Sequence, residues 1–110
     1  MKQIKPFTGN WRITGMEVWD QDYVDMEVPG YIRISSDGTG QFQFGLVSGD
    51  IDGRVEQCGN VPRFEFSWSG QDENDPMCGR GWAVIENGEL NGRIYLHLSD
   101  DSAFRAIKGK

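Results

Sequence analysis

The chain has 110 residues, of which 37% are hydrophobic and 12% aromatic, and its formal net charge is −6. This length predicts one domain over residues 1–110, and the composition is too apolar for a disordered chain. The negative charge argues against nucleic acid and anionic membranes as partners, and no apolar run is long enough to span a membrane. The first residues lack the apolar stretch of a secretory signal, so we expect a cytoplasmic protein.

The stretch WDQDYVDMEVPG, residues 19–30, is the one predicted helix. Trp19, Tyr23 and Met26 fall at i, i+4 and i+7, which forms one helical stripe. Asp20 can cap the start of this helix, and Pro29-Gly30 can end it. We interpret residues 19–26 as a plug whose stripe faces inward. An exposed partner surface and a metal site remain alternatives.

The other segments read as short strands, separated by glycine-containing turns about every ten residues. Alternation of apolar and polar residues is clearest in residues 41–47, 63–69 and 92–99. It places Leu46 on the apolar face of the first of these segments and Leu98 on that of the third. Weaker patterns cover residues 10–14, 31–35, 51–57, 81–86 and 103–107, and hairpin turns are expected at 36–40 and 86–90.

Together these elements predict an all-β fold. We expect an antiparallel up-and-down meander of about eight strands, closed as a small barrel, with one short helix after the first strand. An eight-stranded barrel can be filled by side chains or can hold one small ligand. The predicted core side favours a filled interior because it carries large aromatic residues: Trp11, Phe42, Phe44, Phe64, Phe66, Trp68, Trp82 and Phe104.

The first and last predicted strands carry Gly9-Asn10-Trp11 and Arg105. With this strand order, the chain resembles the calycin superfamily of β-barrels, which includes lipocalins, fatty-acid-binding proteins and avidins. The resemblance implies that Gly9, Trp11 and Arg105 close one barrel end, with the guanidinium over the indole. It also implies a ligand cavity. The chain further resembles small uncharacterised prokaryotic proteins that share residues 19–30 and 79–84, a resemblance that carries no known activity.

Few residues suggest metal or redox chemistry. Cys58 and Cys78 each precede a glycine and are expected as free thiols, with a disulfide as the alternative. Together with His97, the only histidine, they are one ligand short of a zinc site. The acidic loops around Asp20, Asp50 and Asp72 are expected to be solvated, although clustered carboxylates leave calcium open. We expect no metal site and no cofactor.

No nucleophile or phosphate-loop motif is present, so we expect no catalysis. The leading hypothesis is a small binding or interaction module, monomeric or homodimeric, with its contact surface near the barrel end at residues 19–26. The alternatives are a homo-oligomeric structural protein that assembles through residues 81–86, and a lipocalin-like carrier of a small apolar ligand. The polar stripe around His97 is either a wet outer face or a small anion site. Candidate contacts for a small ligand or protein partner are Trp19, Tyr23, Met26, Trp68, Trp82, Arg93, Tyr95 and His97.

Overall fold

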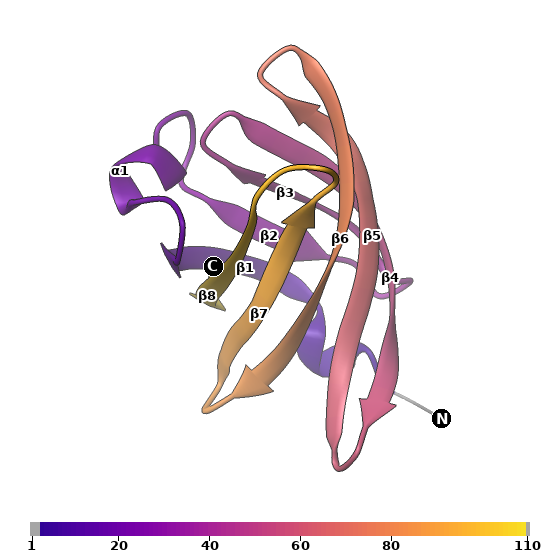
Figure 1. The fold of residues 1–110 in the computed structure, drawn as a ribbon. Coiled ribbons are helices and arrows are strands. Elements are labelled where there is room, and N and C mark those ends of the chain that lie inside the picture. The colour runs from indigo at the N-terminus through magenta and orange to yellow at the C-terminus, as the bar shows by residue number, and fades with distance from the viewer. Residues whose placement is uncertain (1–2, 110) are drawn as a thin grey trace.

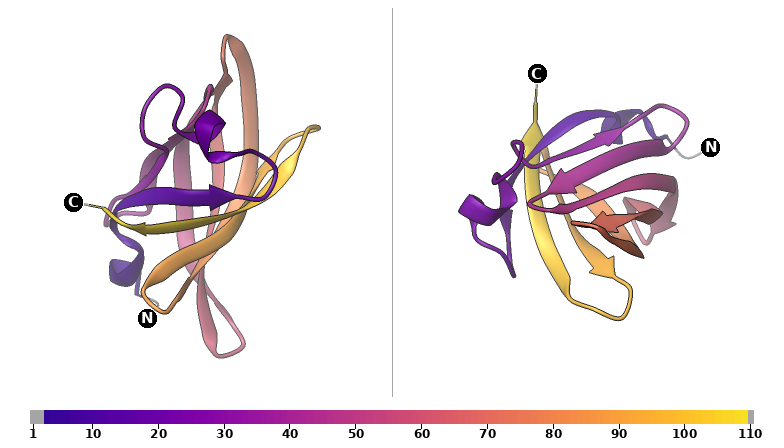
Figure 2. Two further views of the ribbon diagram at one scale, coloured as in Figure 1. Left: turned by 90° about the vertical axis from the view of Figure 1, so that its left-hand side faces the viewer. Right: turned by 90° about the horizontal axis from the view of Figure 1, so that it is seen from above.

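The computed structural model describes residues 3–109 and shows a closed barrel of eight antiparallel strands (Figure 1). The elements are η1 (Lys5–Phe7), β1 (Gly9–Met16), α1 (Gln21–Val24), β2 (Tyr31–Ile34), β3 (Thr39–Phe44), β4 (Val47–Cys58), β5 (Val61–Asp72), β6 (Asp75–Glu86), β7 (Glu89–Leu96) and β8 (Asp101–Lys108). Each strand pairs with the next one in the chain, and β8 runs beside β1 to close the barrel (Figure 2). The predicted fold class and the helix after the first strand are confirmed.

Turn residues explain why the meander closes so tightly. In the turn between β6 and β7, Asn87 and Gly88 have φ angles of 53° and 79°. A hairpin turn with positive φ at both central residues is of type I′, and Asn-Gly adopts it at little cost. The turn expected at residues 36–40 is also present, with Gly38 at a φ of 90° between β2 and β3.

Two strands end earlier than their hydrophobic patterns suggested. β3 stops at Phe44, and Gly45, with a φ of 57°, opens the hairpin turn that contains Leu46. β7 stops at Leu96, and Leu98 is 94% exposed with a φ of 59°. The prediction that Leu46 and Leu98 continue the core faces of their strands is therefore wrong. A residue with left-handed backbone angles turns the chain out of the strand. The alternation of apolar and polar residues does not show where such a turn begins.

Aromatic rings fill the interior of the barrel because glycines make room for them. A Cβ added at Gly49 would lie 2.6 Å from the Trp68 ring, and one added at Gly81 would lie 2.5 Å from Phe66. Phe42 packs edge-on against Trp68, with ring centres 5.0 Å apart. Buried aliphatic side chains from α1 and from every strand except β3 and β5 occupy the remaining space: Ile13, Val24, Ile32, Ile34, Val47, Ile51, Val55, Ala83, Leu90, Ile94, Leu96 and Ala106.

Trp82 is an exception to the predicted core. It lies on the outer face, opposite Glu65 in register, with the Arg63 guanidinium 4.4 Å from its ring centre. The neighbouring Ala83 is the buried residue, at 1% exposure. The segment 81–86 is apolar on both faces, so its sequence does not show which face turns inward. Placing Trp82 in the core was wrong for this reason.

The two helices close opposite ends of the barrel. At one end, η1 inserts Phe7, whose ring centre is 6.0 Å from that of Phe64. The Trp11 indole Nε1 donates to the Phe7 carbonyl at 2.9 Å and holds η1 in place. At the other end, the Gly45 amide in the β3–β4 turn donates to the carbonyl of Val24 in α1 at 2.9 Å.

Candidate functional site

The plug, residues 19–26, is held mainly by contacts to the barrel end. The Asp20 carboxylate accepts a hydrogen bond from the Tyr23 amide at 3.0 Å, which confirms the predicted cap. The Trp19 ring centre lies 4.9 Å from that of Phe44, and the Tyr23 hydroxyl accepts from the Leu46 amide at 3.3 Å. Trp19 and Tyr23 thus pack against the core rather than forming an open aromatic surface.

Met26 does not follow the stripe. Its side chain is 48% exposed, whereas Val24 is fully buried and takes the inward position. α1 contains four residues and ends at Val24, so no second turn exists to bring the i+7 residue to the same face. The prediction that Met26 faces inward is wrong because the helix is shorter than the stripe requires.

Asp25 ties the end of the plug to β1 and β2. Its Oδ1 accepts from the Gly30 amide at 2.8 Å, and its Oδ2 accepts from Gln21 at 3.0 Å and from Arg12 at 3.2 Å. Partial burial alone would raise the pKa of Asp25, but the hydrogen bonds from Gly30 and Gln21, with the Arg12 charge, hold it below its ordinary value. This acid of the plug therefore has a structural role.

The polar stripe predicted on β7 is divided among separate contacts. Arg93 is paired with Asp101 at 2.5 Å and with Glu17 at 3.0 Å. Tyr95 lies under the Arg80 guanidinium, 4.3 Å from its ring centre, and His97 is exposed beyond the end of β7. The structure therefore gives Arg93 and Tyr95 separate protein partners and places His97 outside the strand.

The remaining ligand candidate on the core side is Trp68. It is 3% exposed, and its indole Nε1 donates to the Tyr95 carbonyl at 3.1 Å. The ring is therefore buried in the core, and its polar atom is already hydrogen-bonded within the protein. Trp68 and Trp82 lie on opposite faces of the sheet, so the structure does not bring these two tryptophans together.

The predicted closure by Arg105 is wrong, and Lys108 takes that position. The Lys108 Nζ lies 4.3 Å from the centre of the Trp11 ring and donates to the Thr8 carbonyl beside Gly9. Arg105 points outward with a side chain that is 62% exposed, 3.9 Å from Glu89. Side chains alternate along β8, so Arg105 takes the outer face next to the buried Phe104 and Ala106.

Cys58 and Cys78 are free and exposed, as expected. Cys58 pairs in register with Val61 and Cys78 with Ser69, at distant points of β5. Val61 and Ser69 are eight positions apart along β5, a distance of roughly 26 Å, which excludes the disulfide alternative. Among residues 3–109, no group of three or more His, Cys, Asp or Glu side chains is placed to hold a metal ion.

A hollow that combines positive charge with an apolar surface lies on the outer face of β1, β2 and β8; its volume is about 420 Å³, and we call it the basic groove. Its lining residues are Asn10, Arg12, Val28, Pro29, Tyr31, Arg33, Ile107, Lys108 and Gly109. Val28 and Ile107 are 38% and 43% exposed, and they supply an apolar surface. Arg12, Arg33 and Lys108 supply three positive charges in one hollow of an acidic protein.

The basic groove could not be predicted from the sequence because its three cations are far apart in the chain. Arg12 and Arg33 occupy outward positions of β1 and β2, and Lys108 lies at the end of β8. The register places Arg12 opposite Tyr31, and Trp11 opposite Lys108. The available signal was the combination of outward-facing arginines on the first two strands with a lysine at the end of the last strand, which lies beside the first once the barrel closes.

Comparisons with known proteins support the fold. No protein-family model matches the chain, and no curated protein sequence matches it. A solved structure that does match is the apo crystal structure of Caenorhabditis elegans lipid binding protein 8, with a TM-score of 0.56 and 16% identity over 99% of each chain. This match and the closed barrel confirm the expected resemblance to calycin-type barrels at the level of the fold.

Both helices that the structure describes are short. Between residues 3 and 109, neither the 3-10 helix η1 nor the single-turn α1 has the length and apolar character needed to cross a bilayer.

Proposed function

We propose that this protein is a non-catalytic binding module that holds a small amphipathic anion in the basic groove. The observation that carries the proposal is the meeting of three cations with exposed apolar residues on a chain of net charge −6. Convergent charged groups beside an apolar surface are typical of ligand sites. Similar charges scattered singly over the surface would carry no such meaning.

The cations favour a carboxylate or phosphate head group. Arg33 lies over the Tyr31 ring at 5.4 Å, which limits the orientations of its guanidinium, and Arg12 is already oriented by Asp25 at 3.2 Å. Oriented guanidinium groups bind anions through charge-assisted hydrogen bonds that are shorter and stronger than neutral ones. An anion here gains attraction from Arg12, Arg33 and Lys108, and it competes with Asp25 for Arg12.

The apolar residues favour a ligand with a hydrocarbon part. Val28, Pro29 and Ile107 lie in the same hollow as the cations and remain partly or largely exposed. Covering apolar surface stabilises a complex by about 25 cal/mol per Å². Neither a bare inorganic anion nor a neutral hydrocarbon would use both halves of the basic groove.

We propose a site outside the barrel because aromatic side chains occupy the interior. The matching solved structure is that of a lipid binding protein, and this likeness supports an amphipathic ligand for the present chain as well. In this chain, however, aromatic rings such as Phe42 and Trp68 pack in the interior at 5.0 Å, so an apolar ligand inside would have to displace them. Interior carriage therefore has less support than binding in the basic groove.

The proposed contact surface lies a short distance from the one expected at residues 19–26. Val28 and Pro29 directly follow the plug, and Asp25 connects the plug to Arg12 at the edge of the groove. Assembly through residues 81–86 has less support because Arg63 covers the Trp82 ring and Ile85 packs against the core.

The test is titration of the protein with dodecanoate, followed by calorimetry, with dodecanol as the uncharged probe of similar length. We expect dodecanoate to bind and dodecanol to bind at least about fivefold more weakly, since a charge-assisted hydrogen bond contributes roughly 1.5 to 3 kcal/mol. Arg33→Gln should weaken dodecanoate binding by a similar factor. Arg105→Gln, on the outer face of β8, is the matched control and should leave it unchanged.

A variant of the interior separates the basic groove from an internal site. Phe66→Leu changes the packing inside the barrel without touching the groove, so the affinity for dodecanoate should stay the same. The proposal is wrong if Arg33→Gln binds dodecanoate as tightly as the natural chain does, or if Phe66→Leu alters the affinity while Arg33→Gln does not.

A further inference from the structure

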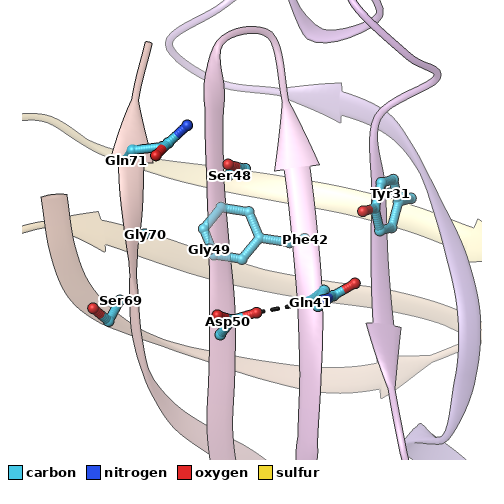
Figure 3. A pocket seen from close by; sticks show the side chains of 9 residues that line it. All are labelled: Tyr31, Gln41, Phe42, Ser48, Gly49, Asp50, Ser69, Gly70 and Gln71. Carbon is cyan, nitrogen blue, oxygen red and sulfur yellow. Dashed lines mark hydrogen bonds between the residues drawn. The ribbon is translucent and has the colours of Figure 1, made fainter. Parts of the chain in front are cut away.

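A second hollow, which we call the polar hollow, lies beside the basic groove on the outer face of β2 to β5 (Figure 3). Its volume is about 350 Å³, and Tyr31 borders both hollows. Figure 3 shows Tyr31 on one side, Ser69 and Gln71 on the opposite side, and Ser48 between them. The short Ser48 side chain lies between these two sides, on the strand that separates them.

The lining of the polar hollow differs in chemistry from that of the basic groove. It presents hydroxyl groups from Ser48 and Ser69 and side-chain amides from Gln41 and Gln71. Asp50 is the one ionisable carboxylate in this lining, and no Lys or Arg contributes to it. The hollow therefore offers many hydrogen-bonding groups and little net charge, which disfavours the anions that suit the basic groove.

Most of this hydrogen-bonding capacity is unused by the protein. The Gln41 amide donates to Asp50 at 3.4 Å, which is a long hydrogen bond. Within residues 3–109, the side chains of Ser48, Ser69 and Gln71 donate to or accept from no other protein group. Three neighbouring polar side chains from β4 and β5 are thus free to bind the same ligand.

We propose that the polar hollow binds a neutral, hydroxyl-rich ligand of the saccharide class. A sugar hydroxyl both donates and accepts a hydrogen bond, and so do a serine hydroxyl and a glutamine amide group. The Asp50 carboxylate accepts two adjacent hydroxyl donors well. The Tyr31 ring supplies an amphipathic wall that can contact the C–H face of a sugar ring. The polar hollow is a different site, with a different ligand class, from the proposed anion-binding groove, and saccharide binding does not depend on anion binding.

The size of the polar hollow fits one sugar unit of a longer chain. Its volume of about 350 Å³ is at the lower end of typical ligand pockets, which start at roughly 300 Å³. A small open site bears the full cost of immobilising its ligand and gains few contacts, so we expect a Kd of roughly 1 mM. An oligosaccharide that extends along the outer face gains additional contacts.

The test uses maltotriose, cellotriose and chitotriose as probes at about 10 mM, which is above the Kd expected of such a site. Amide chemical shifts are measured by two-dimensional NMR of the isotope-labelled protein, and triglycine serves as a peptide probe. We expect at least one trisaccharide to shift the amides of residues 48–50 and 69–71 in a saturable way. We expect triglycine to leave those amides unchanged.

Two variants of β5 provide the matched comparison. Ser69→Phe fills the polar hollow and should reduce binding at least about fivefold, whereas Ser67→Phe lies on the same strand and the same face but outside the hollow. The inference is overturned if no trisaccharide shifts these amides, if triglycine shifts them equally, or if both variants bind like the natural chain. A dodecanoate titration of Ser69→Phe reports on the basic groove separately, so the failure of one proposal is distinguishable from that of the other.

Discussion

The ammonium group of Lys108 lies 4.3 Å from the centre of the Trp11 indole, where the end of β8 pairs with β1. Lys108 also donates to the Thr8 carbonyl. We expect Lys108→Ala to lower the free energy of unfolding by about 1 kcal/mol, since a cation–π contact at an exposed site contributes roughly 0.5 to 1 kcal/mol. Urea unfolding measures the change. Arg105→Ala should cost less than about 0.5 kcal/mol, and a larger loss for Arg105 than for Lys108 would contradict this assignment.

Glycine at position 49 is predicted to be required for packing of the core. A methyl group there would lie 2.6 Å from Trp68 and 2.9 Å from Phe42, so Gly49→Ala should destabilise the fold by about 1 to 3 kcal/mol. Gly15→Ala is the control, because its nearest atom, in Arg105, is 4.0 Å away. Thermal unfolding of both variants checks the difference. Equal midpoints would mean that the interior has spare room.

The plug gives a prediction about α1. Val24 is fully buried and Met26 is 48% exposed. Val24→Ala should therefore lower the free energy of unfolding by about 2 kcal/mol, through lost burial and a cavity. Met26→Ala should change it by less than about 0.5 kcal/mol. If denaturant unfolding shows a larger loss for Met26→Ala than for Val24→Ala, then Met26 faces inward, as the helical stripe in the sequence predicted.

The lowered pKa of Asp25 predicts that the stability of the fold depends on pH in the acidic range. Its pKa in the folded state lies below its ordinary value, so the ionised carboxylate stabilises the fold at neutral pH. That contribution is lost as pH falls below about 4 and through the folded pKa. Asn cannot titrate, so the stability advantage of the natural chain over Asp25→Asn should shrink between about pH 5 and pH 3. Unfolding by urea at several pH values, with Asp22→Asn as the control, tests this. A constant difference would mean that the charge of Asp25 has no role.

Much of the barrel could be predicted from local features. Period-two alternation in residues such as Phe64, Phe66 and Trp68, together with Asn87-Gly88, specifies strands and turns without knowledge of distant contacts. The errors arose where local pattern is ambiguous. Trp82 belongs to a segment that is apolar on both faces, and Met26 belongs to a stripe that continues past the end of α1.

The candidate sites were harder to predict because they depend on register. Arg12, Arg33 and Lys108 come together only after β1 has paired with both β2 and β8. Ser48 and Ser69 lie on adjacent strands, and each reads locally as an ordinary solvent-facing residue of an alternating strand. The chemistry of the outer face therefore depends on which strands are neighbours. The spacing of residues within one segment does not give that information.

The pairing of β1 with β8 has a consequence for how the chain folds. Every other ladder joins strands that follow each other in sequence, whereas this one joins strands at opposite ends of the chain. Closing so long a loop costs about 3 kcal/mol more chain entropy than closing a hairpin of about four residues. The ladders between consecutive strands from β1 to β8 can therefore form progressively, and we expect the closing ladder, interrupted by a register shift between Ile13 and Gly15, to form last. Amide hydrogens of that ladder should exchange with solvent sooner than those of β4 and β5.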